Sequence, residues 1–292
     1  MKTIIALLFG LITVAEAQTF TEALKKESAF EVKGDKNTVI IANLNGEVRV
    51  EGYDGDKVLV EANKKIYAKT PERLERGKKE IQLGFIDRAD TLIYYVDGAC
   101  QGFGRDQNSR KWNKSRWNYS WYNCDNGNCD LPYDFEVDFT VKVPKGIHVM
   151  VSTVNEGDVV VKNVKGIVYA NNVNGSIRLD QLERESVAST INGDVDIEFT
   201  KNPDKDCRFY SLNGDINAYF QKGLAANMTF ESFNGDLFTN INDLESLPVQ
   251  VKKEDAKRGT RYKVNGSAYK IGKGGALLDF ETFNGNVYLK EK

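Results

Sequence analysis

Aromatic and basic residues gather in one stretch of the sequence and could bind sugars. All three tryptophans lie there among tyrosines and basic residues: Trp112, Trp117 and Trp121, Tyr119 and Tyr122, and Arg110, Lys111, Lys114 and Arg116. Exposed aromatic rings stack on sugar rings, and neighbouring basic groups suit anionic glycans. The same rings could instead pack over the side or the open end of the fold, because a long loop needs its own anchors. Both interpretations stay open for this stretch.

A recurring aspartate could bind a metal ion or act as a catalytic acid. It follows a glycine at regular intervals, at Asp158, Asp194, Asp215 and Asp236. Carboxylates stacked on neighbouring repeats could bind calcium, but the chain lacks the Gly-Gly-x-Gly-x-Asp repeat of calcium-binding solenoids. Asp194 and Asp215 could also imitate the acid pair of a polysaccharide hydrolase or lyase. Because most repeats carry a similar acid, ordinary turn chemistry on a solvated face is the favoured interpretation.

The other chemistry-bearing residues show no enzyme signature. His148 is the only histidine, and it lies in an apolar, strand-like run without a serine or cysteine partner motif. The sequence has no nucleophile elbow, no phosphate-binding glycine loop and no histidine-containing zinc spacing. We therefore expect no catalytic residues, no metal and no cofactor. The net charge of -2 gives no field that would favour nucleic acid.

The four cysteines suit an oxidising compartment. Cys124 and Cys129 flank an Asn-Gly pair, which is a preferred centre of a two-residue hairpin turn. Such a turn would place these two cysteines opposite each other, at a distance that allows a disulfide. Cys100 and Cys207 could form a second bridge between this loop and the rest of the chain. Alternatively, Cys207 is a free, buried thiol.

An internal repeat organises the chain, in which an Asn-Gly motif stands between apolar residues. Its copies are Leu44–Val48, Val154–Val159, Val173–Ile177, Ile191–Val195, Leu212–Ile216, Phe233–Leu237 and Phe283–Val287. The glycines from Gly157 to Gly235 are 18, 18, 21 and 21 residues apart. A fixed period of this kind is typical of repeat architectures. We expect the structural turns to be formed by Gly157, Gly175, Gly193, Gly214, Gly235 and Gly285, with Asn174, Asn192, Asn213, Asn234 and Asn284.

Each repeat is predicted to form two short strands joined by tight turns. Apolar and polar residues alternate after each motif, most clearly from Asp194 to Phe199, which indicates strands with one buried face. Antiparallel hairpins could use such units, but the equal spacing of one recurring motif favours a solenoid with parallel stacking. Stacked asparagines would then form a hydrogen-bonded ladder, and glycine would allow a positive φ at the corner. The sequence therefore predicts an all-β fold, a parallel β-helix or solenoid with about 18–21 residues per coil.

The predicted core follows the alternation, and the remaining segments are less regular. A short helix is expected around Thr70–Arg76, which has a threonine cap and an early proline. The last copy should end the solenoid, where the charges of Lys290–Lys292 would discourage end-to-end stacking. We expect the inward-facing residues to include Val159, Val161, Ile177, Leu179, Val195, Ile197, Ile216 and Leu237.

The N-terminus resembles a secretory signal. Lys2 precedes an apolar run from Ile4 to Val14, and Ala15-Glu16-Ala17 is a small-residue cleavage site. The expected domains are a signal peptide at 1–17, an N-terminal extension at 18–34 and a β-solenoid domain at 35–292, which contains the aromatic insertion at 98–132. No later segment reaches the length of a transmembrane helix. We therefore expect an exported chain, periplasmic or at the cell surface, without a transmembrane segment once it is mature.

The repeats resemble the bacterial exported "putative adhesin" family of β-strand repeats. The resemblance rests on the serial Asn-Gly motifs, the run Ser152–Asn155 and the closing segment from Ile271 to Asn286, and it covers roughly residues 35–290. It implies a β-helix-like fold and an envelope location, and it implies no reaction. "Adhesin" is itself a label drawn from fold similarity, so the resemblance constrains function only loosely.

Three functional hypotheses follow. The first is a non-enzymatic adhesin-like or scaffold protein of the cell envelope, which binds a protein or another surface partner through its repeat face. The second is a glycan-binding module that uses the Trp-rich insertion. The third, and least favoured, is a polysaccharide hydrolase or lyase.

Overall fold

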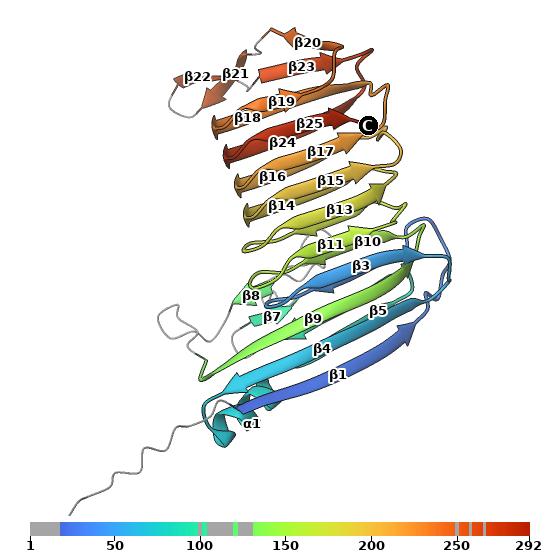
Figure 1. Ribbon diagram of the computed structural model, residues 1–292, viewed down its shortest axis with the longest axis vertical. Coiled ribbons are helices and arrows are strands. Elements are labelled where there is room, and N and C mark those ends of the chain that lie inside the picture. Colours follow the sequence, from blue (N-terminus) through green and yellow to red (C-terminus); the bar gives the residue numbers. More distant parts are fainter. Residues whose placement is uncertain are drawn as a thin grey trace, which may run out of the picture.

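The computed structural model describes residues 18–98, 101–103, 119–121, 131–248, 251–256, 259–264 and 267–292. These residues form a long stack of strands, with α1 and β1 near one end and β20 and β23 at the other (Figure 1). A single helix occurs in this part of the chain, α1 (Pro71–Glu80), and no helix there is long and apolar enough to cross a membrane. The signal peptide expected at 1–17 lies outside the described residues.

The first large sheet, sheet A, has ten strands. Their spatial order is β1 (Gln18–Ser28), β4 (Val58–Ala68), β9 (Tyr133–Pro144), β3 (Val48–Tyr53), β11 (Val159–Lys162), β13 (Ile177–Leu182), β15 (Val195–Phe199), β17 (Ile216–Phe220), β25 (Val287–Glu291) and β19 (Leu237–Thr239).

The second large sheet, sheet B, has eleven strands. Their spatial order is β20 (Leu244–Leu247), β23 (Ser267–Ile271), β18 (Ala226–Asn234), β24 (Ala276–Asn284), β16 (Cys207–Asn213), β14 (Ser186–Asn192), β12 (Val168–Asn171), β10 (His148–Ser152), β2 (Thr38–Ala42), β6 (Thr91–Asp97) and β5 (Gln82–Arg88). Two further pairs of strands form two-stranded sheets of their own, β7 (Gln101–Phe103) with β8 (Tyr119–Trp121) and β21 (Val251–Ala256) with β22 (Gly259–Val264).

The repeats form coils, and each coil is a strand of sheet B, a corner at the Asn-Gly motif, and a strand of sheet A. The coils are β2–β3, β10–β11, β12–β13, β14–β15, β16–β17, β24–β25 and β18–β19, in spatial order. Neighbouring coils pair in parallel in both sheets. The structure is therefore a largely parallel, two-sheet arrangement of the β-solenoid type, as the repeat predicts.

One continuous apolar core fills the space between the two sheets. The alternation of the sequence accounts for it, because every second side chain of a strand points to the same side. Val195 is fully buried and Ile197 is 1% exposed, and the other predicted inward residues are likewise buried, except for Leu237, which is only partly buried in the last coil.

The N-terminal part extends both sheets with antiparallel strands. β1 pairs with β4, and β4 pairs with β9, while β9 itself runs parallel to β3. The residues expected as an extension at 18–34 thus contain the outermost strand of sheet A. The predicted short helix is present as α1, with Thr70 at its N-cap accepting a hydrogen bond from the Arg73 N–H.

The spatial order of the coils corrects the prediction that the last copy ends the solenoid. Strand β25 lies between β17 and β19, and β24 lies between β16 and β18. The chain therefore passes over one position, forms β18–β19, and later returns to fill the gap with β24–β25. As a result, Lys290 and Glu291 belong to an interior strand, and β19 is the edge of sheet A. The identical corner chemistry of the copies makes this order possible, because each coil fits on any other.

Candidate binding surface on the second sheet

Seven asparagines form a hydrogen-bonded ladder at the coil corners. Except in the first coil, the side-chain amide of each donates to the side-chain oxygen of the asparagine one coil closer to the N-terminal end, over 2.8 to 3.1 Å. The ladder expected from stacked Asn-Gly motifs is thus present. It runs through Asn45, Asn155, Asn174, Asn192, Asn213, Asn284 and Asn234.

A second ladder joins a small polar side chain to the glycine carbonyl of the preceding coil. Thr190 Oγ1 donates to the Gly175 carbonyl over 2.9 Å, and Ser211 Oγ donates to the Gly193 carbonyl over 2.8 Å. The equivalent donors in other coils are Thr153, Asn172, Thr282 and Ser232. In the first coil, the Asn43 amide donates to the Val137 carbonyl of β9 and to the Gly46 carbonyl of its own coil. These side chains satisfy carbonyls at corners that strand pairing does not reach.

The recurring aspartates belong to a third ladder. Asp158 accepts a hydrogen bond from the Ser176 N–H, Asp194 from the Asp215 N–H, and Asp215 from the Asn286 N–H, over 2.7 to 2.9 Å. The carboxylates thus act as acceptors for the neighbouring backbone. Across the described part of the chain, no group of three or more histidine, cysteine, aspartate or glutamate side chains is placed to hold a metal ion.

Strand β9 begins all three ladders. The Phe135 and Val137 carbonyls accept from the side-chain amides of Asn45 and Asn43, and Asp138 Oδ1 accepts from the Glu47 N–H over 3.0 Å.

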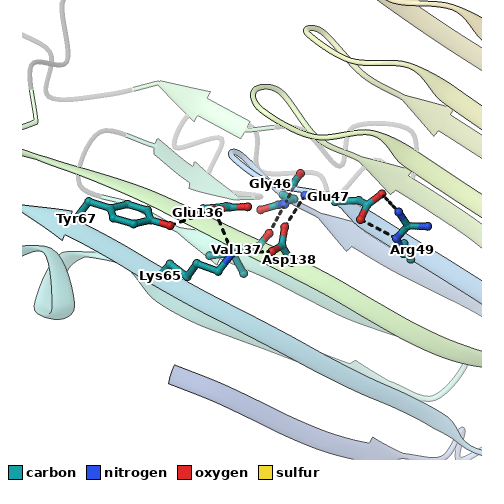
Figure 2. A network of polar contacts seen from close by, with 9 residues as sticks. Gly46, Glu47, Arg49, Lys65, Tyr67, Glu136, Val137 and Asp138 are labelled. Carbon is teal, nitrogen blue, oxygen red and sulfur yellow. Dashed lines mark hydrogen bonds and ion pairs between the residues drawn. The ribbon is translucent and has the colours of Figure 1, made fainter. Parts of the chain in front are cut away.

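Charged side chains surround this starting point, as Figure 2 shows. Lys65 lies 3.3 Å from Glu136 and 3.4 Å from Asp138. Its hydrogen bond to Glu136 raises the pKa of Lys65. Asp138 is thereby held between a cation on β4 and the first coil (Figure 2).

The corner glycines are required mainly by close approach, and only in part by a positive φ. A Cβ on Gly214 would lie 2.1 Å from the Gly193 carbonyl oxygen, and one on Gly285 would lie 2.0 Å from that of Gly214. Neither of these two glycines has a positive φ, whereas Gly46 does, at 111°. The expectation that a positive φ explains each glycine is therefore wrong for these two corners.

An apolar residue precedes each asparagine, and these residues form a column along the corners that is buried at Leu44 and exposed at Ile191, Phe283 and Phe233. We call this set the corner column: Leu44, Val154, Val173, Ile191, Leu212, Phe283 and Phe233, in spatial order. Leu44 is 2% exposed, Val154, Val173 and Leu212 are half-buried, and Ile191, Phe283 and Phe233 are 40%, 44% and 73% exposed. The rings of Phe233 and Phe283 stack with centroids 4.8 Å apart and planes 5° apart.

A shallow groove of about 240 Å³ lies beside this aromatic end. Rings and carboxylates share its walls, which are formed by Tyr210, Leu212, Glu231, Ser232, Phe233, Glu281, Thr282 and Phe283. Glu281 forms an ion pair with Arg208 over 2.7 Å, while the exposed carboxylate of Glu231 has no hydrogen-bond or ion-pair partner among the described residues. The groove thus combines aromatic faces with one uncompensated negative charge.

Both large sheets carry ion pairs on their outer faces, and on sheet B Arg208 pairs with Asp279 and Glu281. On sheet A, Lys162 lies 3.4 Å from Asp180, and Arg178 lies 3.4 Å from Asp196 on the neighbouring coil. Exposed apolar side chains are more numerous on sheet B, namely Tyr169, Ile191, Leu277, Phe283 and Phe233, than on sheet A, where they are Leu24 and Phe238. Among these residues Phe233 and Phe283 are in contact, and contiguous exposed apolar residues are typical of interaction sites.

His148 and Cys207 occupy structural positions. His148 Nδ1 accepts a hydrogen bond from the Ile167 N–H over 2.9 Å, and burial together with the charge of Arg184 lowers the pKa of His148. Cys207 is a free thiol with 2% exposure, and burial raises its pKa to about 11. Of the two alternatives for Cys207, the structure shows the buried thiol.

The aromatic insertion lies largely outside the described residues. This applies to Trp112, Trp117, Tyr122, Cys100, Cys124 and Cys129, so their predicted glycan-binding and disulfide roles stay predictions. The backbone of Tyr119–Trp121 forms β8 and pairs with β7. At the start of the insertion, Phe103 stacks on Tyr95 at 5.1 Å and is 4% exposed on the outer side of sheet B.

Sequence reasoning recognised the corner motif but missed the outward direction of its apolar residue. The signal was present two positions before each asparagine, where every copy carries Thr, Ser or Asn. In strand β14, Ala188 and Thr190 point inward, so the alternation places Ile191 outside. In this coil the small polar residue, and not the apolar one, lies in the interior of the corner, whereas Leu44 of the first coil belongs to the apolar core.

Comparison with known proteins found similarity only at the level of overall structure. No family model matches the chain, and no curated protein matches its sequence. The chain is similar to a "putative cell adhesion protein" from Clostridium sporogenes, with a TM-score of 0.44, 11% identity, and coverage of 94% of this chain and 100% of that chain. It is also similar to a "putative adhesin" from Bacteroides fragilis, with a TM-score of 0.30, 11% identity, and coverage of 93% and 97%. At this level of similarity, neither structure identifies a ligand of this chain.

Proposed function

We propose that this chain is an exported, non-enzymatic adhesin-like or scaffold protein of a bacterial cell envelope, and that it binds a partner protein through the outer face of sheet B. One observation carries the proposal: the corner column runs along successive coils and ends in two stacked, exposed phenylalanines. The signal-like residues 1–17 support export.

The aromatic end of the column is the main contact in this proposal. Phe233 is 73% exposed and Phe283 is 44% exposed, so both rings have apolar surface to lose to a partner. Fully burying a phenylalanine side chain contributes roughly 1.5–3 kcal/mol. Rigid, partly supported rings at the centre of a contact are the usual positions of binding hot spots.

The groove favours a basic side chain of the partner. Glu231 supplies a negative charge without a described partner, and Tyr210 and Phe283 supply aromatic faces beside it. A lysine or arginine placed there would gain both an ion pair and a cation–π contact. The proposed partner segment is therefore apolar with at least one basic residue.

The hydrogen bonds of the candidate catalytic groups support a non-enzymatic role. Asp194 and Asp215 each accept a backbone N–H of the next coil, and the Nδ1 lone pair of His148 accepts the Ile167 N–H. General acid–base catalysis requires such groups to be within reach of a substrate proton. Side chains that accept backbone N–H groups in this way hold neighbouring coils together, which is a structural role.

Site-specific photo-crosslinking in producing cells tests the proposal. The crosslinking residue benzoylphenylalanine would replace Leu212 on the corner column or, as a matched control, Tyr219, which faces outward from sheet A on the same coil. We expect a discrete protein adduct from position 212 only, and we expect its loss when Phe233→Ser and Phe283→Ser are introduced together. Equal adducts from both positions, or adducts that persist in the double variant, would contradict the proposal.

A further inference from the structure

In the three corner ladders, the donors of one coil bond to the acceptors of its neighbour, always in the same direction. The coil at one end of the stack therefore keeps hydrogen-bonding groups without a partner among the described residues. From β14–β15 onward, each coil donates its asparagine amide, its hydroxyl and its backbone N–H after the glycine to the coil on its N-terminal side. In the opposite direction, the N–H of each corner glycine from Gly175 onward that has a following coil donates to the asparagine carbonyl of that coil, as Gly285 does to Asn234 over 3.1 Å. The first coil is satisfied by β9. The last coil, β18–β19, has no coil after it.

The corner of this last coil therefore presents a set of unused groups. Within the described chain, the Asn234 side-chain oxygen, the Gly235 N–H and carbonyl, and the Asp236 carboxylate have no hydrogen-bond partner. Asn234 and Asp236 are exposed, as are Phe238 and Thr239 on the adjoining strand. These groups lie in the same arrangement that the preceding corners use to hold a neighbour.

Among the described residues, strands cover only the sheet B half of this end. Strand β23 pairs antiparallel with β18 from Ala226 to Phe230 and leaves residues 231–234 beyond its reach. On the sheet A side, β19 pairs with β25 and, in the part of the chain that the structure describes, is the last strand. The uncovered region thus consists of one corner and one short strand.

We propose that this end is a docking site for an extended segment of another protein that carries the chain's own corner motif, Ser/Thr-apolar-Asn-Gly-polar-apolar. The molecule itself identifies the occupant, because every other coil position is filled by a segment of this chemistry with the same hydrogen bonds. The bound segment adds a strand in parallel to β19, which is a known mode of peptide recognition at sheet edges.

Each group of the bound segment has an assigned partner. Its asparagine amide donates to Asn234 Oδ1, its hydroxyl donates to the Gly235 carbonyl, and its N–H after the glycine donates to the Asp236 carboxylate. Its asparagine carbonyl accepts the Gly235 N–H, and its apolar residue before the asparagine extends the stack of Phe233. A glycine is required in the segment, because a Cβ at Gly235 or Gly285 would lie 1.8 or 2.0 Å from the neighbouring glycine oxygen.

The proposal concerns the end of the stack and is independent of the proposed function of the sheet B face. Its test uses the mature full-length chain and a fluorescent synthetic peptide with the sequence of residues 281–291, measured by fluorescence anisotropy. We expect saturable binding with one peptide per chain. A peptide with Gly285→Val should bind at least about tenfold more weakly, which corresponds to about 1.4 kcal/mol.

Variants of the protein locate the bound peptide. Asp236→Leu removes the carboxylate that accepts the incoming N–H, and we expect it to weaken binding without unfolding the chain, because that carboxylate has no partner in the described fold. Asp236→Asn keeps an acceptor, as Asn286 provides in the preceding coil, and should preserve binding.

Three results would overturn the proposal. They are no binding at millimolar peptide, equal binding of the Gly285→Val peptide, and binding that survives Asp236→Leu. The last result would place the peptide in the interior slot of β24–β25 by exchange.

Discussion

At the corners of the stack, the backbone of each glycine lies against the glycine carbonyl of the neighbouring coil. This contact explains why glycine recurs there even where its φ is not positive, as at Gly214. Strand spacing is set by hydrogen bonding at about 4.7–4.9 Å, so the coils cannot move apart to admit a methyl group. Glycine is therefore required at these corners because it has no side chain.

The substitution Gly214→Ala measures this requirement. The added Cβ would lie 2.1 Å from the Gly193 carbonyl oxygen, so we expect the free energy of unfolding to fall by about 1–3 kcal/mol, as for overpacking in a core. Urea denaturation followed by circular dichroism would measure it. The matched control is Gly146→Ala, where a Cβ would meet nothing within 4 Å and φ is not positive. Equal stability of the two variants would contradict the steric explanation.

For single residues, the sequence predicts well which strand side chains are buried. It predicts poorly whether the apolar residue at a corner points inward or outward. Alternation correctly places Val195 and Ile197 inside, because a strand has only two faces. It also places Ile191 outside, but the apolar character of that residue suggests an interior position. The conflict is resolved by Thr190, whose hydroxyl is needed inside to satisfy the Gly175 carbonyl.

Among the secondary-structure elements, β24 and β25 show what a repeated motif cannot determine. Each coil carries the same corner chemistry, so the sequence predicts that coils stack but not in which order. The order depends on the segment between β19 and β24, which forms the antiparallel strands β20 and β23 at the end of sheet B. The position of the last copy between β17 and β19 therefore could not be predicted from the repeat and is seen only in the structure.

Truncation after Gly275 tests the role of this inserted coil. Removing β24–β25 deletes the neighbour that pairs with β18 from Ala226 to Asn234 and with all of β19. We expect amides of β18–β19 to lose hydrogen-exchange protection by mass spectrometry, while β10–β15 keep theirs. If β18–β19 instead remain protected, the coil has closed the gap by docking directly on β16–β17, and the inserted coil is dispensable.

Across the whole molecule, the two ends of the stack are built differently. The N-terminal end is closed by long antiparallel strands, and its edge strand β1 carries charged residues such as Lys25 and Lys26, which discourage edge-to-edge association. The C-terminal end finishes in the three residues of β19, with Phe238 47% exposed. This difference makes the C-terminal end the one suited to adding a strand.

The stacked arrangement also predicts which strands a destabilising substitution affects, because each coil contacts mainly its neighbours. Ile197→Asp places a charge at a position that is 1% exposed, which costs several kcal/mol when the charge has no partner. We expect hydrogen exchange to show lost protection in β13, β15 and β17, with β1, β4 and β9 still protected. Asp196→Asn on the outer face of the same strand is the control and should change little. Uniform loss of protection from β1 to β25 would mean that the stack opens as a single cooperative unit, and that coil-by-coil stability is the wrong description of this fold.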